Sequence, residues 1–251
     1  MNHPARIVAC ACAALALLGA SCAAPPQLVA PEVLLSPYAG SATSPLWAVA
    51  PLVNESGTST ADNLAVTDAV VAKVAEARGL ACVPTNRVIA AMRALGLASV
   101  SSPADARVLA DALGVDALVV GSITAFDPYD PPTLGLTLGV IHRSSQPNTV
   151  DPRQLQNAAA EPTAPPSSGA PSVVVSEHLD GKNHEVLMSL KRYADGRHNP
   201  QGALGWRSYL ASMDLYTEFA AYWTVGRLLD GERLRMSRDG LAAQSPPPTQ
   251  P

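Results

Sequence analysis

Residues 115–126, VDALVVGSITAF, and residues 133–141, TLGLTLGVI, are the two stretches that decide the fold. The first is a nearly continuous apolar run of strand length. The second alternates with a period of two, which places every second side chain on one face of a strand. Its apolar face consists of Leu134, Leu136, Leu138 and Val140. We therefore predict two long neighbouring strands joined by the proline-rich turn DPYDPP at 127–132.

Upstream and downstream of these strands, short apolar runs alternate with helix-like segments. Further strands are predicted at 46–53 (LWAVAPLV), 80–84 (LACVP) and 173–175. Helices are predicted at 60–79, 85–96, 103–114, 181–194 and 206–229, the first three each ending at a glycine. This order predicts an α/β fold with a single sheet and flanking helices, in a three-layer arrangement.

The distribution of prolines divides the chain into a predicted folded part and three proline-rich segments outside it. Only three of the 23 prolines fall between residues 46 and 126, whereas fifteen lie in three stretches rich in small and polar residues. We interpret 23–45 as a Pro/Ala/Ser-rich spacer, 143–171 as a disordered insertion and 236–251 as a disordered tail. Residues 46–142 and 172–235 then form one α/β domain.

The N-terminus, MNHPARIVACACAALALLGASC, has the order of a signal peptide over residues 1–22. Its apolar run of about a dozen residues is too short for the ~20 that span a bilayer. The small residues before Cys22 resemble a bacterial lipobox, in which the cysteine is acylated and becomes the first mature residue. Ordinary cleavage near 20–24 is the alternative, but a solvated spacer after Cys22 favours acylation. Ala23, rather than aspartate, fits outer-membrane sorting by analogy with enteric bacteria.

Composition limits the partners and the redox chemistry. The net charge is −4 and no basic block occurs, so nucleic acid is not an expected partner. Of the four cysteines, Cys82 alone lies outside the leader and the predicted acyl site. No disulfide framework is therefore expected, and we interpret Cys82 as a buried, inert thiol.

The predicted helix at 206–229 holds more than half of the aromatic residues of the chain. One interpretation is an aromatic stripe that packs on the sheet, because aromatic side chains bury a large area. The other is that Trp206, Tyr209, Tyr216 and Trp223 form a surface for a partner. Both interpretations are open at this point.

Residues that could catalyse a reaction or bind a metal are few and poorly spaced. Glycine-rich phosphate loops and the GxSxG motif do not occur. His178 and His184, each beside a glutamate, lie six residues apart, which is not the spacing of a zinc site. Asp127 and Asp130 could form an acid–base or calcium pair, but each precedes a proline, as is typical of turns. We predict no enzyme activity, no metal and no cofactor.

Three segments, AVAPLVNESG at 48–57, LACVPTNRVIAAMRALG at 80–96 and LGVDALVVGSITAFDPYDPP at 113–132, carry a resemblance to known proteins. They resemble the periplasmic α/β domain of a group of envelope lipoproteins. The group includes the curli-secretion lipoprotein, the lipoprotein activators of penicillin-binding proteins and the N-terminal domain of the Tol-system propeller protein. The resemblance covers 46–142 and implies a lipid-anchored protein that acts through protein contacts rather than catalysis.

The sequence therefore predicts a lipid-anchored, periplasm-facing envelope lipoprotein, in the outer membrane. We expect it to be a non-catalytic protein-binding or assembly factor whose envelope protein partner is unknown. The alternative is an oligomeric secretion or transport component of the outer membrane, since the curli-secretion protein forms a pore. A pore would need paired spanning strands, and the proline-rich stretch 143–171 cannot supply the second strand.

Overall fold

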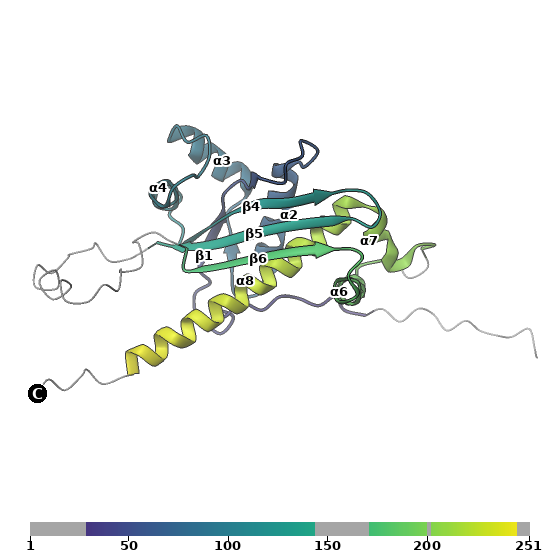
Figure 1. Cartoon of the computed structure of the whole chain (residues 1–251). Coiled ribbons are helices and arrows are strands. Elements are labelled where there is room, and N and C mark those ends of the chain that lie inside the picture. Colours follow the sequence, from purple (N-terminus) through teal and green to yellow (C-terminus); the bar gives the residue numbers. More distant parts are fainter. Residues whose placement is uncertain (1–28, 144–170, 200–201, 245–251) are drawn as a thin grey trace, which may run out of the picture.

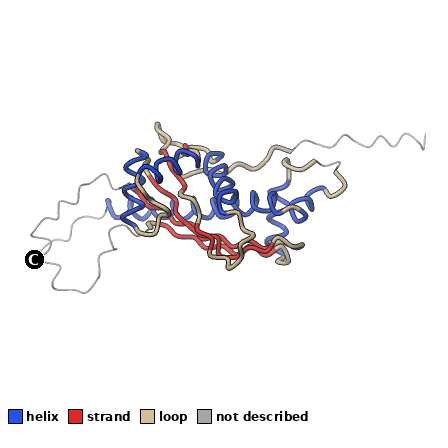
Figure 2. Tube along the Cα trace, turned by 90° about the horizontal axis from the view of Figure 1, so that it is seen from above, coloured by secondary structure: helices blue, strands red, loops and turns tan. Residues whose placement is uncertain are grey.

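A computed structural model describes residues 29–143, 171–199 and 202–244 (Figures 1 and 2). The predicted signal peptide, Cys22, most of the predicted insertion and the end of the predicted tail lie outside these residues. Within the described ranges, none of the helices combines the length and apolar character needed to cross a bilayer.

A single mixed sheet forms the centre of the fold. Its strands are β1 (Leu46–Val49), β2 (Val53–Asn54), β3 (Ala81–Cys82), β4 (Ala117–Asp127), β5 (Thr133–His142) and β6 (Val173–Asp180). The order is β3-β1-β4-β5-β6, and β2 pairs with β4. The β1, β2 and β3 pairings are parallel, whereas β4–β5 and β5–β6 are antiparallel. Residues 115–126 and 133–141 thus contribute neighbouring strands, β4 and β5, as predicted.

Helices cover both faces of this sheet (Figure 1). They are α2 (Asn63–Glu76), α3 (Thr85–Ala94), α4 (Pro103–Leu113), α6 (His184–Ala194), α7 (Ser208–Ala211) and α8 (Met213–Gln244), with a 3₁₀ helix at Gly205–Arg207. The predicted α/β class and three-layer arrangement are confirmed.

Alternation along the central strand β4 explains why both faces carry helices. Leu118 packs in a core with residues of α3 and α4, whereas its neighbours Ala117 and Val119 pack in the larger core with α2, α6 and α8. Successive strand side chains point to opposite faces, so this apolar run needs cover on both sides.

The C-terminal helix differs from its predicted bounds at both ends. Residues 206–211 form a 3₁₀ turn and the short α7, and α8 then runs unbroken through the predicted tail to Gln244. The predicted disordered tail is therefore wrong for residues 236–244. The last side chains of this helix that are buried against the domain are Leu228, Leu229 and Glu232, which precede residue 236.

The predicted spacer also differs, because residues 29–40 lie against the domain; we call this segment the N-terminal strap. Leu35 bridges to Arg78, next to the end of α2, and Ser36 is only 4% exposed. Farther along, the Tyr38 hydroxyl bonds to Glu232 of α8. The interpretation of all of 23–45 as solvated spacer is thus wrong for the strap, because its backbone and side chains find partners on the domain.

Candidate functional site

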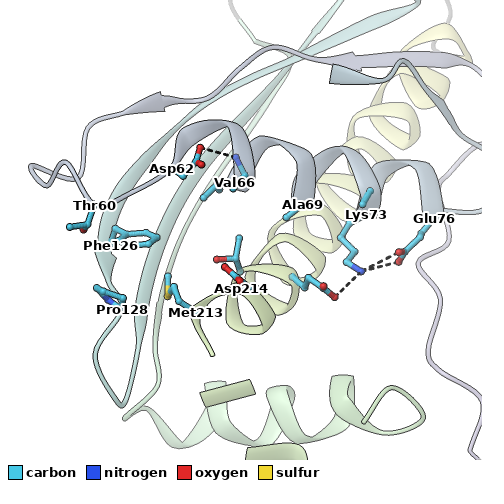
Figure 3. Close-up of a pocket in the computed structure, with 14 residues that line it drawn as sticks. Thr60, Asp62, Val66, Ala69, Lys73, Glu76, Phe126, Pro128, Met213 and Asp214 are labelled. Carbon is cyan, nitrogen blue, oxygen red and sulfur yellow. Dashed lines mark hydrogen bonds and ion pairs between the residues drawn. The ribbon is translucent and has the colours of Figure 1, made fainter. Parts of the chain in front are cut away.

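A cleft opens between α2, the end of β4 and the beginning of α8 (Figure 3). Its volume is ≈ 520 Å³, within the range of pockets that bind small molecules or a few side chains. Its apolar and small lining residues are Ala65, Val66, Ala69, Ala72, Phe126, Pro128 and Met213. Its polar lining residues are Thr60, Asp62, Lys73, Glu76, Asp214, Thr217 and Glu218.

The sequence of α2 explains why this space is open. Val66, Val70 and Val74 are buried in the core that α2 shares with α8. The neighbouring face of the same helix carries Ala65, Ala69 and Ala72, spaced by four and three residues so that they line up. Alanine side chains are too short to fill the gap to α8, and the cleft results.

A nearly buried lysine links the two helices at one end of the cleft. Lys73 is 5% exposed, and its ammonium nitrogen lies 3.1 Å from Glu76 Oε1 on the same helix and 3.8 Å from Glu218 Oε2 on α8. The ammonium group also lies 5.8 Å from the centre of the Tyr193 ring. The charge of Lys73 is therefore already neutralised within the protein, since both carboxylates and a ring face lie close to it.

The carboxylates of the cleft outnumber its single cation. Asp62 caps α2 by accepting hydrogen bonds from the backbone N–H groups of Leu64 and Ala65. Asp214, in the first turn of α8, forms no ion pair or side-chain hydrogen bond with the described residues and is exposed. With four carboxylates and one ammonium, the cleft has a formal charge of −3. Its chemistry favours a ligand that brings apolar groups and a positive charge.

The four aromatic residues predicted as a partner surface do not share one surface. Tyr209 and Tyr216 are 4% and 0% exposed, so for these two residues the surface interpretation is wrong. Tyr216 faces inward because it packs on Phe219, and its hydroxyl donates to the Leu179 carbonyl oxygen at 3.0 Å. Burial raises the pKa of the Tyr216 hydroxyl.

The two tryptophans of that set are partly exposed and lie apart in the fold. Trp223 of α8 donates from its indole nitrogen to Glu177 Oε2 at 2.9 Å, which ties it to β6. Trp206 lies in the 3₁₀ turn, where the Arg207 guanidinium stacks 4.9 Å from its ring centre. Of these two tryptophans, Trp223 lies in α8, whereas Trp206 lies in the 3₁₀ turn that precedes α7.

The candidate metal and acid–base residues are not brought together. Glu177 and His178 are consecutive on β6 and point to opposite faces, and the described residues hold no group of three or more metal ligands. Asp127 accepts a hydrogen bond from the backbone N–H of Tyr129 at 3.1 Å, which is ordinary turn chemistry. Among the described residues, these side chains therefore do not form a common metal or acid–base site.

Sequence reasoning missed the cleft and its charged residues. Lys73 gave one usable signal, because it lies three residues after Val70 on the side of the helix that is otherwise apolar. No sequence pattern singled out Asp214 and Glu218, because the cleft exists only where α8 approaches α2.

Comparisons with known proteins find similarity to solved structures alone. No known protein family and no curated protein matches the sequence. The LpoB C-terminal domain from Salmonella enterica is similar, with 14% identity, coverage of 56% of this chain and 86% of that one, and a TM-score of 0.39. Lipoprotein GNA1162 from Neisseria meningitidis shares 17% identity over 58% of this chain and 89% of that one, with a TM-score of 0.36.

A third similar structure spans more of this chain. Protein CT253 from Chlamydia trachomatis shares 10% identity over 80% of this chain and 99% of that one, with a TM-score of 0.32. The similar structures thus include an LpoB domain and a protein described as a lipoprotein, in line with the resemblance stated from the sequence. All three TM-scores are below 0.5, so the function of this chain is argued from its own residues.

Proposed function

We propose that this protein is an envelope lipoprotein, acylated at Cys22, that binds a protein partner without catalysing a reaction. Its place is the periplasmic side of the outer membrane. The leader and the lipobox-like residues before Cys22 support the anchor. The observation that carries the binding role is the cleft between α2 and α8, with its apolar floor and the exposed carboxylate of Asp214.

The cleft is suited to a short segment of a partner protein. Such a segment places one or two apolar side chains against Ala69, Phe126 and Met213. A lysine or arginine of the same segment reaches Asp214 and Glu218 at the rim. An ion pair of this kind, partly shielded from water, gives specificity for a basic residue more than it gives affinity.

The anchor is tested with Cys22→Ala in the full chain. We expect the variant to leave the membrane fraction, because the acyl chains are its only proposed attachment. Replacement of the other remaining cysteine, Cys82→Ala, is the matched control and should leave the protein in membranes. Unchanged membrane retention of Cys22→Ala would refute acylation.

The cleft is tested with a photoreactive amino acid at Ala72, which lines the cleft and is exposed. The same group at Val108, 50% exposed on α4, is the control for proximity alone. A cleft partner crosslinks at 72 and not at 108, and the yield falls in Asp214→Asn. Asp111→Asn, an exposed aspartate of α4, should not change the yield.

Two outcomes would contradict the proposed partner site. Equal crosslinking at 72 and 108 would mean that the cleft is not the contact. Crosslinks at 72 only to further copies of this chain, in rings of detergent-solubilised protein, would support the oligomeric secretion or transport component instead.

A further inference from the structure

The strand β6 lies at an edge of the sheet, and its outer side has no partner strand among the described residues. It is the last strand in the order β3-β1-β4-β5-β6 and pairs with β5 alone. Edge strands of natural sheets are commonly short, interrupted by a bulge or a proline, or covered by another element. β6 is eight residues long, contains no proline and keeps one register with β5 from Val173 to Asp180. It therefore presents a long, regular edge.

The register of β6 on β5 shows which of its backbone groups point outward. The Gly181 N–H donates to the Pro132 carbonyl oxygen at 2.9 Å. Antiparallel strands exchange hydrogen bonds at every second position, so the odd-numbered residues of β6 bond to β5 and the even-numbered residues point to the open edge. No described residue bonds to the outward N–H and C=O groups of Val174, Ser176 and His178. These groups are free to pair with another extended chain.

The side chains of β6 leave this edge accessible. Val174, on the face of the sheet opposite α8, is 58% exposed. On the face that packs on α8, Glu177 is the one charged side chain of the strand. It accepts a hydrogen bond from the Trp223 indole nitrogen at 2.9 Å and lies 3.8 Å from the Arg227 guanidinium. An inward-facing charge can protect an edge strand, but this carboxylate is already paired within the domain.

A groove opens beside this edge, between α6 and α8. Its volume is ≈ 440 Å³, and it is lined by Trp223 and Arg227, the two residues that contact Glu177. Met188 of α6, which is 44% exposed, also lines it. Two carboxylates and two guanidinium groups lie among the lining residues, so the groove has no net formal charge. It therefore suits an uncharged apolar side chain, in contrast to the acidic cleft between α2 and α8.

From these observations we infer that β6 accepts an extended segment of a partner protein as a further strand of the sheet. The backbone of the segment bonds to the outward groups of β6, and one of its apolar side chains enters the groove beside Trp223. In strand addition, main-chain hydrogen bonds supply affinity and pockets for alternate side chains supply specificity. The inference goes beyond the proposed function, because it uses neither Cys22 nor the cleft.

The arrangement of the helices at this edge favours a single segment over a whole second copy of the chain. Figure 1 shows α8 passing behind the sheet and continuing beyond β6, with α6 beyond the end of the strand. A second copy paired antiparallel through its own β6 would bring its α8 to the same face of the joined sheet, where the two helices would crowd each other. An extended segment needs only the strip next to β6, about 4.8 Å wide.

The free edge is tested by hydrogen exchange of the purified full chain, followed residue by residue by NMR. The outward amides of Val174, Ser176 and His178 should exchange fast. The amides of Val175 and Glu177, which bond to β5, should exchange at least about tenfold more slowly. Equal protection of the two sets would mean that the edge is already covered, and it would overturn the inference.

The partner strand is tested with a photoreactive amino acid at Val174 or at His178, in cells that produce the full chain. The two positions are four residue steps apart, and both strands rise about 3.3 Å per residue. We therefore expect both positions to crosslink to one protein, at sites about four residues apart. The same group at Val108, 50% exposed on α4, is the control for proximity alone.

Matched substitutions separate backbone pairing from side-chain contact. His178→Pro removes an outward N–H and no bond to β5, and it should lower the crosslink at Val174 about fivefold. His178→Ala should leave that crosslink unchanged. Met188→Lys places a charge in the groove and should also weaken the crosslink, whereas Leu95→Lys, at an apolar site 38% exposed after α3, should not. Urea unfolding reports whether each variant is folded, and Met188→Lys decides if His178→Pro is not.

Three results would overturn the added strand. Crosslinks at Val174 and His178 no stronger than at Val108 would mean that the edge has no partner. Crosslinks to residues 144–170 of the same chain, or to β6 of a second copy, would assign the edge to another occupant. Crosslinks to one protein at sites far apart in its sequence would mean contact with a folded surface rather than with a strand.

The failures of the two partner sites are distinguishable in the same cells. Asp214→Asn, which lowers the crosslink at Ala72 if the cleft binds a partner, should leave the crosslink at Val174 unchanged. Loss of the crosslink at Ala72 alone therefore concerns the cleft, and loss of the crosslink at Val174 in Met188→Lys alone concerns the edge of β6.

Discussion

The Tyr38 hydroxyl donates a 2.5 Å hydrogen bond to Oε1 of Glu232, across 194 positions of sequence. The Glu232 side chain is fully buried. Its Oε1 atom also lies 2.6 Å from Arg235 Nη2 and 3.0 Å from His142 Nε2. Burial alone would raise the pKa of the Glu232 carboxyl, but the close approach of His142 and the hydrogen bonds from Arg235 and Tyr38 outweigh burial and hold that pKa well below its usual range. One carboxylate therefore joins the strap, the end of β5 and α8.

The first prediction concerns Gly79, where the strap passes close to the backbone. Gly79 has a φ of +84°, and a Cβ there would lie 2.5 Å from Ala39 Cα. We expect Gly79→Ala to lower the free energy of unfolding by about 2–4 kcal/mol. The left-handed backbone conformation is strained for alanine, and the added Cβ clashes with Ala39. Hydrogen exchange should become faster for the amides of Ser36 and Arg78 than for the central sheet.

Gly96→Ala is the control for the strain alone. Gly96 has a φ of +69°, and no atom lies within 4 Å of its added Cβ. We expect about 1–2 kcal/mol of destabilisation, measured by urea unfolding, with exchange in the strap unchanged. Equal effects of the two substitutions on the strap would contradict a docked segment next to Gly79.

The second prediction is a pH dependence carried by Glu232. The pKa of its carboxyl is lower in the folded protein than the ordinary value of about 4.3 that applies after unfolding. Its contribution is therefore complete above about pH 5 and is lost as the pH falls from there toward the folded-state pKa.

The test compares the native protein with Glu232→Gln. At pH 7 the variant should be less stable by about 3 kcal/mol, because it leaves Arg235 and His142 without their carboxylate. The difference between the two proteins should shrink as the pH falls below about 5. A difference in urea midpoint that stays constant from pH 7 to pH 3 would show that Glu232 does not titrate as described.

The third prediction concerns Lys73 in the cleft. Lys73→Met keeps the aliphatic stem and removes the charge, and its two carboxylate neighbours are about half exposed, at 53% and 47%. Both carboxylates can be solvated, so the free energy of unfolding should change by less than about 1 kcal/mol. Lys73→Ala, which also removes the stem, should cost about 2 kcal/mol. If Lys73→Met lowered the free energy of unfolding as much as Lys73→Ala, the charge of Lys73 rather than the packing of its stem would stabilise the fold.

The fourth prediction concerns Cys82, which is a free cysteine on β3. Burial raises the pKa of its thiol to about 12, so almost none of it is thiolate at neutral pH. At pH 8 we expect iodoacetamide to label it at least about a hundredfold more slowly than the unfolded chain. The experiment measures alkylation with and without urea, and equal rates would contradict the expectation of an inert thiol.

The local elements were predictable because their signals lie close together in the chain. The helix at 103–113 begins where Ser102 and Asp105 exchange hydrogen bonds of 3.1 and 3.0 Å, and it ends at Gly114 with a φ of 66°. The alternation over 133–141 likewise predicted β5 and its buried leucines. In each case the residues that cause the structure are within a few positions of it.

The candidate site and the strap were not predictable in this way. The cleft needs α8 to approach the alanine face of α2, and the strap needs partners at Arg78, Gly196 and Glu232. Proline, alanine and serine in 23–45 indicate a solvated chain, since no local pattern reveals a docking surface elsewhere.

The sequence by itself determined the α/β class and the pairing of the two long strands. The tertiary structure decided that residues 29–40 dock, that α8 continues to Gln244 and that Tyr216 is core while Trp206 is partly exposed. The physical reason is the sequence distance over which each kind of interaction acts. Propensity and periodicity act over a few residues, whereas the buried carboxylate of Glu232 gathers groups from the strap, β5 and α8 that only folding brings together.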